Sequence, residues 1–375
     1  MQKRLCWLTT VLLGGSMLCG TLEASTVYFQ TNLASDVPGL AANLDPNLKN
    51  PWGMSFSGTS PFWVSNQGSN DSTLYNAAGV AQALVVTTPV GPTGQVFANV
   101  AGNFLLPPGT GTAPAPATFI FDTLSGRIAA WNGAQGNPAG TAITVFLATD
   151  NAAFTGLAIA NNTGANLLYA ADFANARIDV FNGSFAPTAV PGGFNDPTLP
   201  AGFSPYNIQN IAGKLYVEYA KVDPVTHLPT RTANTGIVNV FDLNGNLLQR
   251  LATNSHLNSP WGVTQAPAGF GDFAGDILVG NFGDGTISAF NPLTLLFDGT
   301  LSGPSGNPLV NSGLWALNFR APGSGFDPNT LFITAGINGE ADGLFASIQV
   351  APEPGTFLMI ALAGVPLVWR KLRRP

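Results

Sequence analysis

A repeat of roughly 53 residues constrains the fold of this chain more than any other feature of its sequence. Five segments open alike, with a short apolar run followed by a loop rich in Gly, Pro and Asn. Their matching positions are Trp52, Leu157, Ile208, Trp261 and Trp315. The first interval is about twice as long as the others, so we expect a sixth unit inside it. The second half of that unit is visible as the segment 117–133.

The units have the pattern of short β-strands. Strict alternation of apolar and polar residues, as at 286–290, is typical of half-buried strands, and Asp-Gly, Asn-Gly and Ser-Gly dipeptides mark tight turns between them. No segment of the body has the periodicity of an amphipathic helix. Six four-stranded units predict an all-β fold, a six-bladed β-propeller over residues 25–350, which hides its sheet edges by closing on itself. A pair of β-sandwiches is the alternative, but it does not explain the period.

The two ends of the ring must be joined. The last unit has only three expected strands, while the segment 26–33 alternates like a strand and belongs to no unit. We therefore expect this N-terminal strand to be the outer strand of the last blade, paired with the strand that contains Phe345 and Ile348. The three expected strands of the last unit lie near 313–319, 330–335 and 343–350.

Residues 1–24 have the pattern of a secretory signal peptide. Two basic residues precede an apolar run, and small residues precede a cleavage position after Ala24. A lipoprotein signal through Cys19 is a weaker alternative, because Leu18 occupies a position where a small residue is expected. Both Cys6 and Cys19 leave with this segment, so the mature chain is expected to have no disulfide.

Residues 351–375 look like a second processing segment. An apolar run from Gly355 to Trp369 would span about 22 Å as a helix, against a hydrocarbon core of about 30 Å. The basic cluster that follows would stay on the cytoplasmic side of a membrane. A plain C-terminal membrane anchor is one interpretation of this pattern.

The order of its parts also resembles the PEP-CTERM sorting signal of Gram-negative bacteria. That resemblance implies processing by an exosortase, a transient stay in the inner membrane through a C-terminal helix, and delivery to the cell surface or extracellular matrix. The residues that carry it are Pro352, Glu353, Pro354, Arg370, Lys371, Arg373 and Arg374.

Two further resemblances concern the body. The segment 171–181 is similar to an NHL repeat, in which Asp172 would pair with Arg177 while Asn175 supports a turn. Longer segments, such as 278–292 and 331–348, resemble an uncharacterised family of bacterial exported propeller proteins. The resemblance implies the propeller fold and brings no activity with it.

The candidate ligand site is the central channel. Residues at the entry to each inner strand of a propeller surround that channel, and tryptophans recur there. The simplest interpretation is that they pack between blades, and the alternative is that they stack on sugar rings. The candidate residues are Asn50, Trp52, Asn207, Asn258, Trp261 and Trp315.

The sequence gives little support for a metal site or for a site of nucleophilic catalysis. The strand entries carry amides and indoles without Asp or Glu, so we expect no central metal and no cofactor. Asp284 is a weak calcium candidate, because Asp-Gly before an alternating strand first predicts a hairpin turn. His227 and His256 lie in polar loops without a nucleophile motif. Glu218 is expected to face outward on its strand, with a buried acid of raised pKa as the alternative.

Charge excludes one class of partner. The formal net charge is −6, and the basic residues of the body are scattered singly, whereas nucleic-acid binding needs clustered cations. Nucleic acid is therefore not expected as a partner.

The sorting resemblance and the aromatic channel together lead us to expect an exported, non-enzymatic surface or matrix protein that binds an exopolysaccharide or cell-surface glycan. The alternative is a secreted propeller hydrolase or lyase acting on a lactone or polysaccharide.

Overall fold

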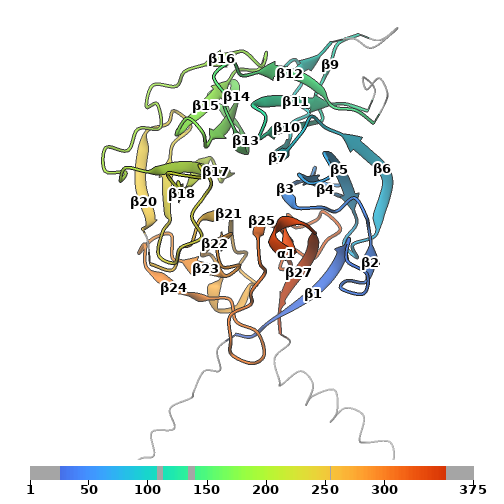
Figure 1. The fold of residues 1–375 in the computed structure, drawn as a ribbon, viewed down its shortest axis with the longest axis vertical. Coiled ribbons are helices and arrows are strands. Elements are labelled where there is room, and N and C mark those ends of the chain that lie inside the picture. The colour runs from blue at the N-terminus through green and yellow to red at the C-terminus, as the bar shows by residue number, and fades with distance from the viewer. Residues whose placement is uncertain (1–25, 108–112, 134–139, 254, 352–375) are drawn as a thin grey trace, which may run out of the picture.

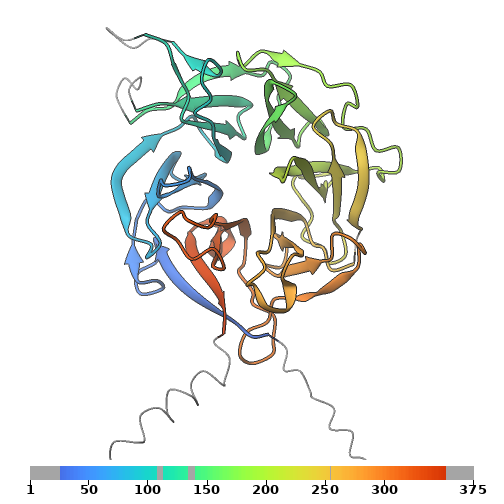
Figure 2. The same ribbon diagram turned by 180° about the vertical axis from the view of Figure 1, so that it is seen from behind.

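Six β-sheets surround a central axis in the computed structural model, which describes residues 26–107, 113–133, 140–253 and 255–351 (Figure 1, and from behind in Figure 2). Each sheet is one blade, and in the first five blades the chain passes from the inner strand to the outer strand before it enters the next blade. The predicted six-bladed propeller is therefore confirmed. A two-stranded ribbon, β8 (Leu105–Leu106) with β9 (Ala115–Pro116), projects from the second blade.

Five blades have four antiparallel strands each. The first is β3 (Pro51–Ser55), β4 (Phe62–Asn66), β5 (Asp71–Tyr75) and β6 (Ala81–Thr87). The second is β7 (Pro92–Phe97), β10 (Phe119–Thr123), β11 (Arg127–Trp131) and β12 (Ile143–Leu147), and it is the unit expected inside the long interval. The third is β13 (Phe154–Asn162), β14 (Ala165–Asp172), β15 (Arg177–Phe181) and β16 (Pro187–Thr188). The fourth is β17 (Phe203–Ile211), β18 (Lys214–Lys221), β19 (Ile237–Phe241) and β20 (Leu247–Thr253). The fifth is β21 (Pro260–Gln265), β22 (Ile277–Asn281), β23 (Ile287–Phe290) and β24 (Phe297–Thr300).

The sixth blade joins the two ends of the described chain. Its inner strands are β25 (Leu314–Phe319), β26 (Leu331–Ala335) and β27 (Leu344–Val350), and its outer strand is β1 (Tyr28–Ser35). β1 pairs antiparallel with β27, opposite Phe345 and Ile348, so the predicted closure is confirmed (Figure 1). A fifth strand, β2 (Asn43–Leu44), adds to β1 in parallel, which the sequence did not predict.

Tyr28 ties this closing strand to the fifth blade as well. Its ring is buried and lies 5.0 Å from the ring of Phe270, and its hydroxyl donates a hydrogen bond to the Phe270 carbonyl at 3.0 Å. Its backbone N–H donates to the Ser302 carbonyl at 3.0 Å. The first strand of the chain therefore holds blades five and six together.

Glycine lets the inner strands approach one another at the axis. A Cβ atom on Gly262 would lie 2.2 Å from the Trp315 carbonyl oxygen, and one on Gly156 would lie 2.1 Å from Asn207 Oδ1. Neither position has room for a side chain, because neighbouring inner strands converge there. The close approach brings the first residues of these strands into mutual contact.

Helix is confined to two short turns within the described residues. They are η1 (Gly271–Phe273) and α1 (Ile337–Glu340), and no helix in the described ranges has the length and hydrophobicity that crossing a bilayer requires. The expected signal segment 1–24, and the sorting segment with Pro352, Glu353, Pro354 and its basic cluster, lie outside the described residues.

Glu218 differs from expectation. The prediction that it faces outward is wrong, because its side chain is fully buried and neither carboxyl oxygen has a hydrogen-bond partner. β18 is the second strand of its blade, where both sheet faces pack against neighbouring blades, so the strand has no solvent face. Burial raises the pKa of Glu218 well above its ordinary value.

We predict that Tyr28→Ala destabilises the protein by about 3–5 kcal/mol, because it removes a buried aromatic ring and the hydrogen bond at the ring closure. The matched control is Phe29→Ala on the same strand, where the side chain is 48% exposed and a change within about 0.5 kcal/mol is expected. Chemical unfolding of the two variants measures the difference. Equal losses would show that closure does not depend on Tyr28.

We also predict that Glu218→Gln gains stability relative to the native chain as pH rises from about 5 to about 8. The folded state keeps a proton on Glu218 that the unfolded state releases, so the native free energy of unfolding falls with pH, by up to about 1.4 kcal/mol per unit. Unfolding curves across this range test it, with the exposed Asp284→Asn as control. A difference that stays constant with pH would contradict a protonated Glu218.

Candidate functional site

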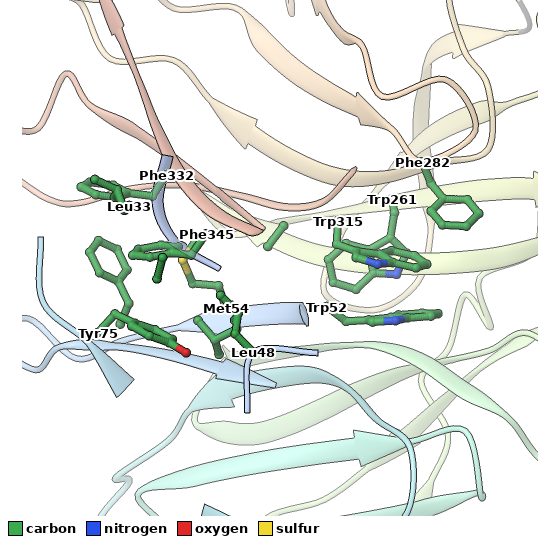
Figure 3. Close-up of a cluster of buried hydrophobic side chains, with 14 of the residues drawn as sticks. Leu33, Leu48, Trp52, Met54, Tyr75, Trp261, Phe282, Trp315, Phe332 and Phe345 are labelled. Carbon is green, nitrogen blue, oxygen red and sulfur yellow. The ribbon is translucent and has the colours of Figure 1, made fainter. Parts of the chain in front are cut away.

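Aromatic rings from several blades meet on the propeller axis. Trp52 and Trp315, from β3 and β25, stack with ring centroids 3.5 Å apart (Figure 3). Trp261 from β21 stands edge-on to both, at 6.0 and 5.6 Å. The structure therefore brings together the three tryptophans that the repeat singled out. Next to Trp261, the inner strands enclose a cavity of only about 20 Å³.

A much larger cavity, about 850 Å³, opens at one mouth of the ring. Every blade contributes to it the loop between its second and third strands. In blade order these loops supply Gln67, Leu124, Phe173 to Asn175, His227 to Pro229 with Arg231, Phe282 and Glu340. A smaller cavity of about 260 Å³ lies at the opposite mouth, where the inner strands end. The larger one is the candidate site, and we call it the entry cavity.

The entry cavity combines aromatic walls with a polar rim. Trp52, Phe173, Tyr206 and Phe282 line it with buried rings. The Tyr206 ring lies 5.1 Å from that of Phe173 and 6.0 Å from that of Phe282. Such a surface suits a ligand with an apolar face and polar edges.

The other predicted site residues have varied surroundings. Asn207 and Trp261 line the small central cavity, and Asn207 Nδ2 donates to the Trp261 carbonyl at 2.6 Å. Asn258 and Trp315 are buried and line neither cavity, although the Trp315 indole donates to Asn50 Oδ1 at 2.9 Å. Of the six, only Trp52 lines the entry cavity directly.

Asn50 connects the tryptophans to the rim. Its Nδ2 donates to Gln67 Oε1 at 2.9 Å and to Glu340 Oε2 at 3.3 Å. Glu340 also forms an ion pair with Arg231, whose guanidinium lies 4.3 Å from the Phe282 ring centroid. Burial raises the pKa of Glu340, and the neighbouring Arg231 opposes that rise.

Strained backbone presents this carboxylate to the cavity. Asn338, Gly339 and Glu340 have φ angles of 54°, 69° and 71°, three consecutive left-handed residues. His227 and Asn50 also have positive φ, at 58° and 43°. Left-handed conformations cost free energy for residues other than glycine and tend to gather at ligand-binding sites.

Trp52 adds a hydrogen-bond donor without an acceptor. The residue is 5% exposed, it lines the entry cavity, and its Nε1–H has no hydrogen-bond partner among the described residues. The equivalent indoles of Trp261 and Trp315 do have acceptors, the Thr155 carbonyl and Asn50 Oδ1. A buried donor without a partner costs free energy, so an acceptor that reached it would stabilise the bound state.

The remaining candidate residues make local contacts. Asp284 Oδ1 accepts hydrogen bonds from the Thr286 amide at 3.0 Å and hydroxyl at 2.7 Å, which closes the turn. The ring of His256 stacks on Phe297 at 3.6 Å, whereas His227 lines the entry cavity. No three His, Cys, Asp or Glu side chains in the described ranges are grouped as metal ligands.

Sequence reasoning missed Arg231 and Glu340. Neither belongs to the repeat, because both lie in loops that differ from blade to blade. The one feature that could have pointed to Arg231 is the length of its loop, 222–236, which is the longest connection between the second and third strands of a blade. It carries Arg231 across the mouth from the fourth blade to the sixth.

Comparison with solved structures shows the same fold. A protein of unknown function from Bacteroides thetaiotaomicron matches with a TM-score of 0.55 at 12% identity, over 87% of this chain and 77% of that one. A streptogramin B lyase matches with a TM-score of 0.50 at 10% identity, over 86% and 98%. At these identities the likeness concerns the fold alone.

Sequence comparison corrects the family expected from motifs. No family model matches the chain. An uncharacterised protein of Acanthamoeba polyphaga mimivirus is 32% identical over 346 residues, covering 88% of this chain and 82% of the relative. A second uncharacterised protein of that virus is 32% identical over 350 residues, covering 88% and 87%.

The assignment to a bacterial exported, NHL-like family with a PEP-CTERM signal is therefore wrong. The NHL-like segment 171–181 on which it partly rested forms a turn, in which Asp172 lies 3.3 Å from Arg177 and accepts a hydrogen bond from Asn175 Nδ2 at 2.7 Å. Short motifs of this kind follow from turn chemistry and arise without common family membership. The chain belongs to the family of uncharacterised mimivirus proteins represented by these two relatives.

Proposed function

We propose that this propeller is a non-enzymatic binding module that takes a carbohydrate, such as an exopolysaccharide or cell-surface glycan, into its entry cavity. The observation that carries the proposal is the cavity itself, about 850 Å³, with aromatic walls and a polar rim supplied by all six blades. The secretory pattern of residues 1–24 supports a location outside the cell.

The walls fit the chemistry of a sugar. Pyranose rings have apolar C–H faces that stack on aromatic rings, and the rings of Phe173 and Tyr206 line the cavity together. Sugar hydroxyl and ring oxygens are acceptors for the unpaired Trp52 indole N–H. Gln67, Asn151 and Asn175 supply further amides around the opening.

We predict that Ala174→Trp abolishes glycan binding. Ala174 is exposed and lines the entry cavity, so an indole there would occupy ligand volume at little cost in stability. The control is Ala81→Trp, the same substitution at an exposed position on the outer strand β6. Binding of the full-length protein to a glycan array measures both. Retained binding by Ala174→Trp would move the site elsewhere, and an array without any bound glycan would contradict the proposal.

A hydrolase or lyase acting on a lactone or polysaccharide is the second candidate. One observation favours it: His227 lines the same cavity as Glu340, so a base and an acid share the site. Glu340 is engaged by Arg231 and Asn50, and no hydrogen bond joins it to His227 in the described structure.

We predict that glycans captured by the array are recovered unchanged after prolonged incubation with the protein. A binding module releases its ligand intact, whereas an enzyme generates new reducing ends or unsaturated sugars. Mass spectrometry of the recovered glycans distinguishes the two. Products that disappear in His227→Ala but persist in His256→Ala would establish the enzymatic function instead.

A further inference from the structure

An ion pair crosses the mouth of the entry cavity between two distant parts of the chain. Arg231 comes from the long loop of the fourth blade, and Glu340 from the left-handed turn of the sixth. We propose that Arg231 exchanges Glu340 for a carboxylate of the ligand, so that the cavity selects acidic sugars of the uronate class. This inference rests on the proposed glycan-binding function.

Arg231 is the cation available to a ligand. It is the only arginine or lysine among the described residues that line the entry cavity. Nearby Arg177 is already committed to Asp150 and Asp179, each at 2.6 Å. Arg231 keeps 41% of its side chain exposed, and its guanidinium is positioned over Phe282. Arginine binds carboxylates through two parallel, charge-assisted hydrogen bonds, which are stronger than its hydrogen bonds to the neutral oxygens of a sugar.

Glu340 occupies the place of the ligand carboxylate. Its backbone is held left-handed in a strained turn, and its second oxygen accepts a bond from Asn50 at 3.3 Å. The left-handed backbone of this turn costs conformational free energy, and it places a carboxylate beside Arg231. A ligand carboxylate that takes this position would let the turn relax.

Proton balance follows from the exchange. Once Arg231 turns to the ligand, Glu340 loses the cation that favours its ionised form, while its partial burial continues to favour the neutral form. The pKa of Glu340 therefore rises further when the ligand binds, so binding is coupled to proton uptake by Glu340, and no covalent bond is made or broken. The other titratable side chains that face this exchange are His227 and Asp150, the latter held by Arg177 at 2.6 Å. Through Glu340, binding of the acidic sugar is expected to strengthen as pH falls toward the raised pKa of this residue.

The second anchor for such a ligand is Trp52. Its unpaired Nε1–H is a donor at the aromatic wall, while Arg231 is a donor at the rim. A ligand that accepts hydrogen bonds at both ends and has an apolar face between them satisfies both groups. A uronate combines these features, because it has ring and hydroxyl oxygens, C–H faces and a carboxylate.

Titration calorimetry of the full-length protein with trigalacturonate and with its methyl ester tests the proposal. The ester keeps the sugar rings and removes the charge. The acid is expected to bind about tenfold or more tightly than the ester.

Variants of the ion pair give a second test. Arg231→Gln should lower the affinity for the acid to that for the ester. Glu340→Gln should raise the affinity for the acid, because the Glu340 carboxylate no longer competes for Arg231. In a His227→Gln background, which removes the other titratable side chain of the rim, the pH dependence should be lost on Glu340→Gln. Lys214→Gln, which removes an exposed charge on β18, should behave as the native chain.

The possible outcomes distinguish selection of acidic sugars from the more general proposal of glycan binding. If acid and ester bind equally well and Ala174→Trp abolishes both, the glycan module stands and selection of acidic sugars is overturned. If Glu340→Gln weakens acid binding as Arg231→Gln does, the ion pair only holds the loop in place and the exchange is refuted. If neither probe binds, selection of uronates fails, and the glycan array decides the broader proposal. Thermal unfolding of each variant confirms that it is folded.

Discussion

The antiparallel pairing of β1 with β27 is the interaction on which the rest of the molecule depends. It completes the sixth blade, and it brings that blade against the first, where the chain would otherwise be open. The stacked pair of Trp52 and Trp315 lies across this junction, and so does the hydrogen bond from Asn50 to Glu340. The geometry of the entry cavity therefore depends on a closure made, in the described structure, by hydrogen bonds, packing and the ion pairs of Lys49 with Asp36 and Asp342.

Most of the fold could be predicted because it repeats. A period of about two residues marked the strands, and a period of about 53 counted the blades, so even the unit without a clear opening, which contains β10 and β11, was found. Two features carried no such signal. β2 is a two-residue addition with no alternation to detect, and Glu218 belongs to a strand that is buried on both faces, where alternation no longer separates inside from outside.

The candidate site was predictable only in its repeated part. Tryptophans at equivalent positions of different units had to converge if the ring closed, and they do so at the axis. Arg231 and Glu340 occur once each, in loops whose paths are set by tertiary contacts, so no pattern in one unit could pair them. The family was misjudged for a related reason: the motif around Asp172 describes how a chain turns, and many unrelated β-proteins turn in the same way.

The way in which the six blades share the entry cavity has an evolutionary consequence. Each loop is rooted in a hairpin whose own ladder of backbone hydrogen bonds fixes its base, so an insertion in one loop leaves the strand registers of the other five unchanged. Recognition can thus diversify one sector at a time on a constant scaffold. Within a family of such proteins, we expect the loop 222–236 to be the first place where members differ in ligand specificity.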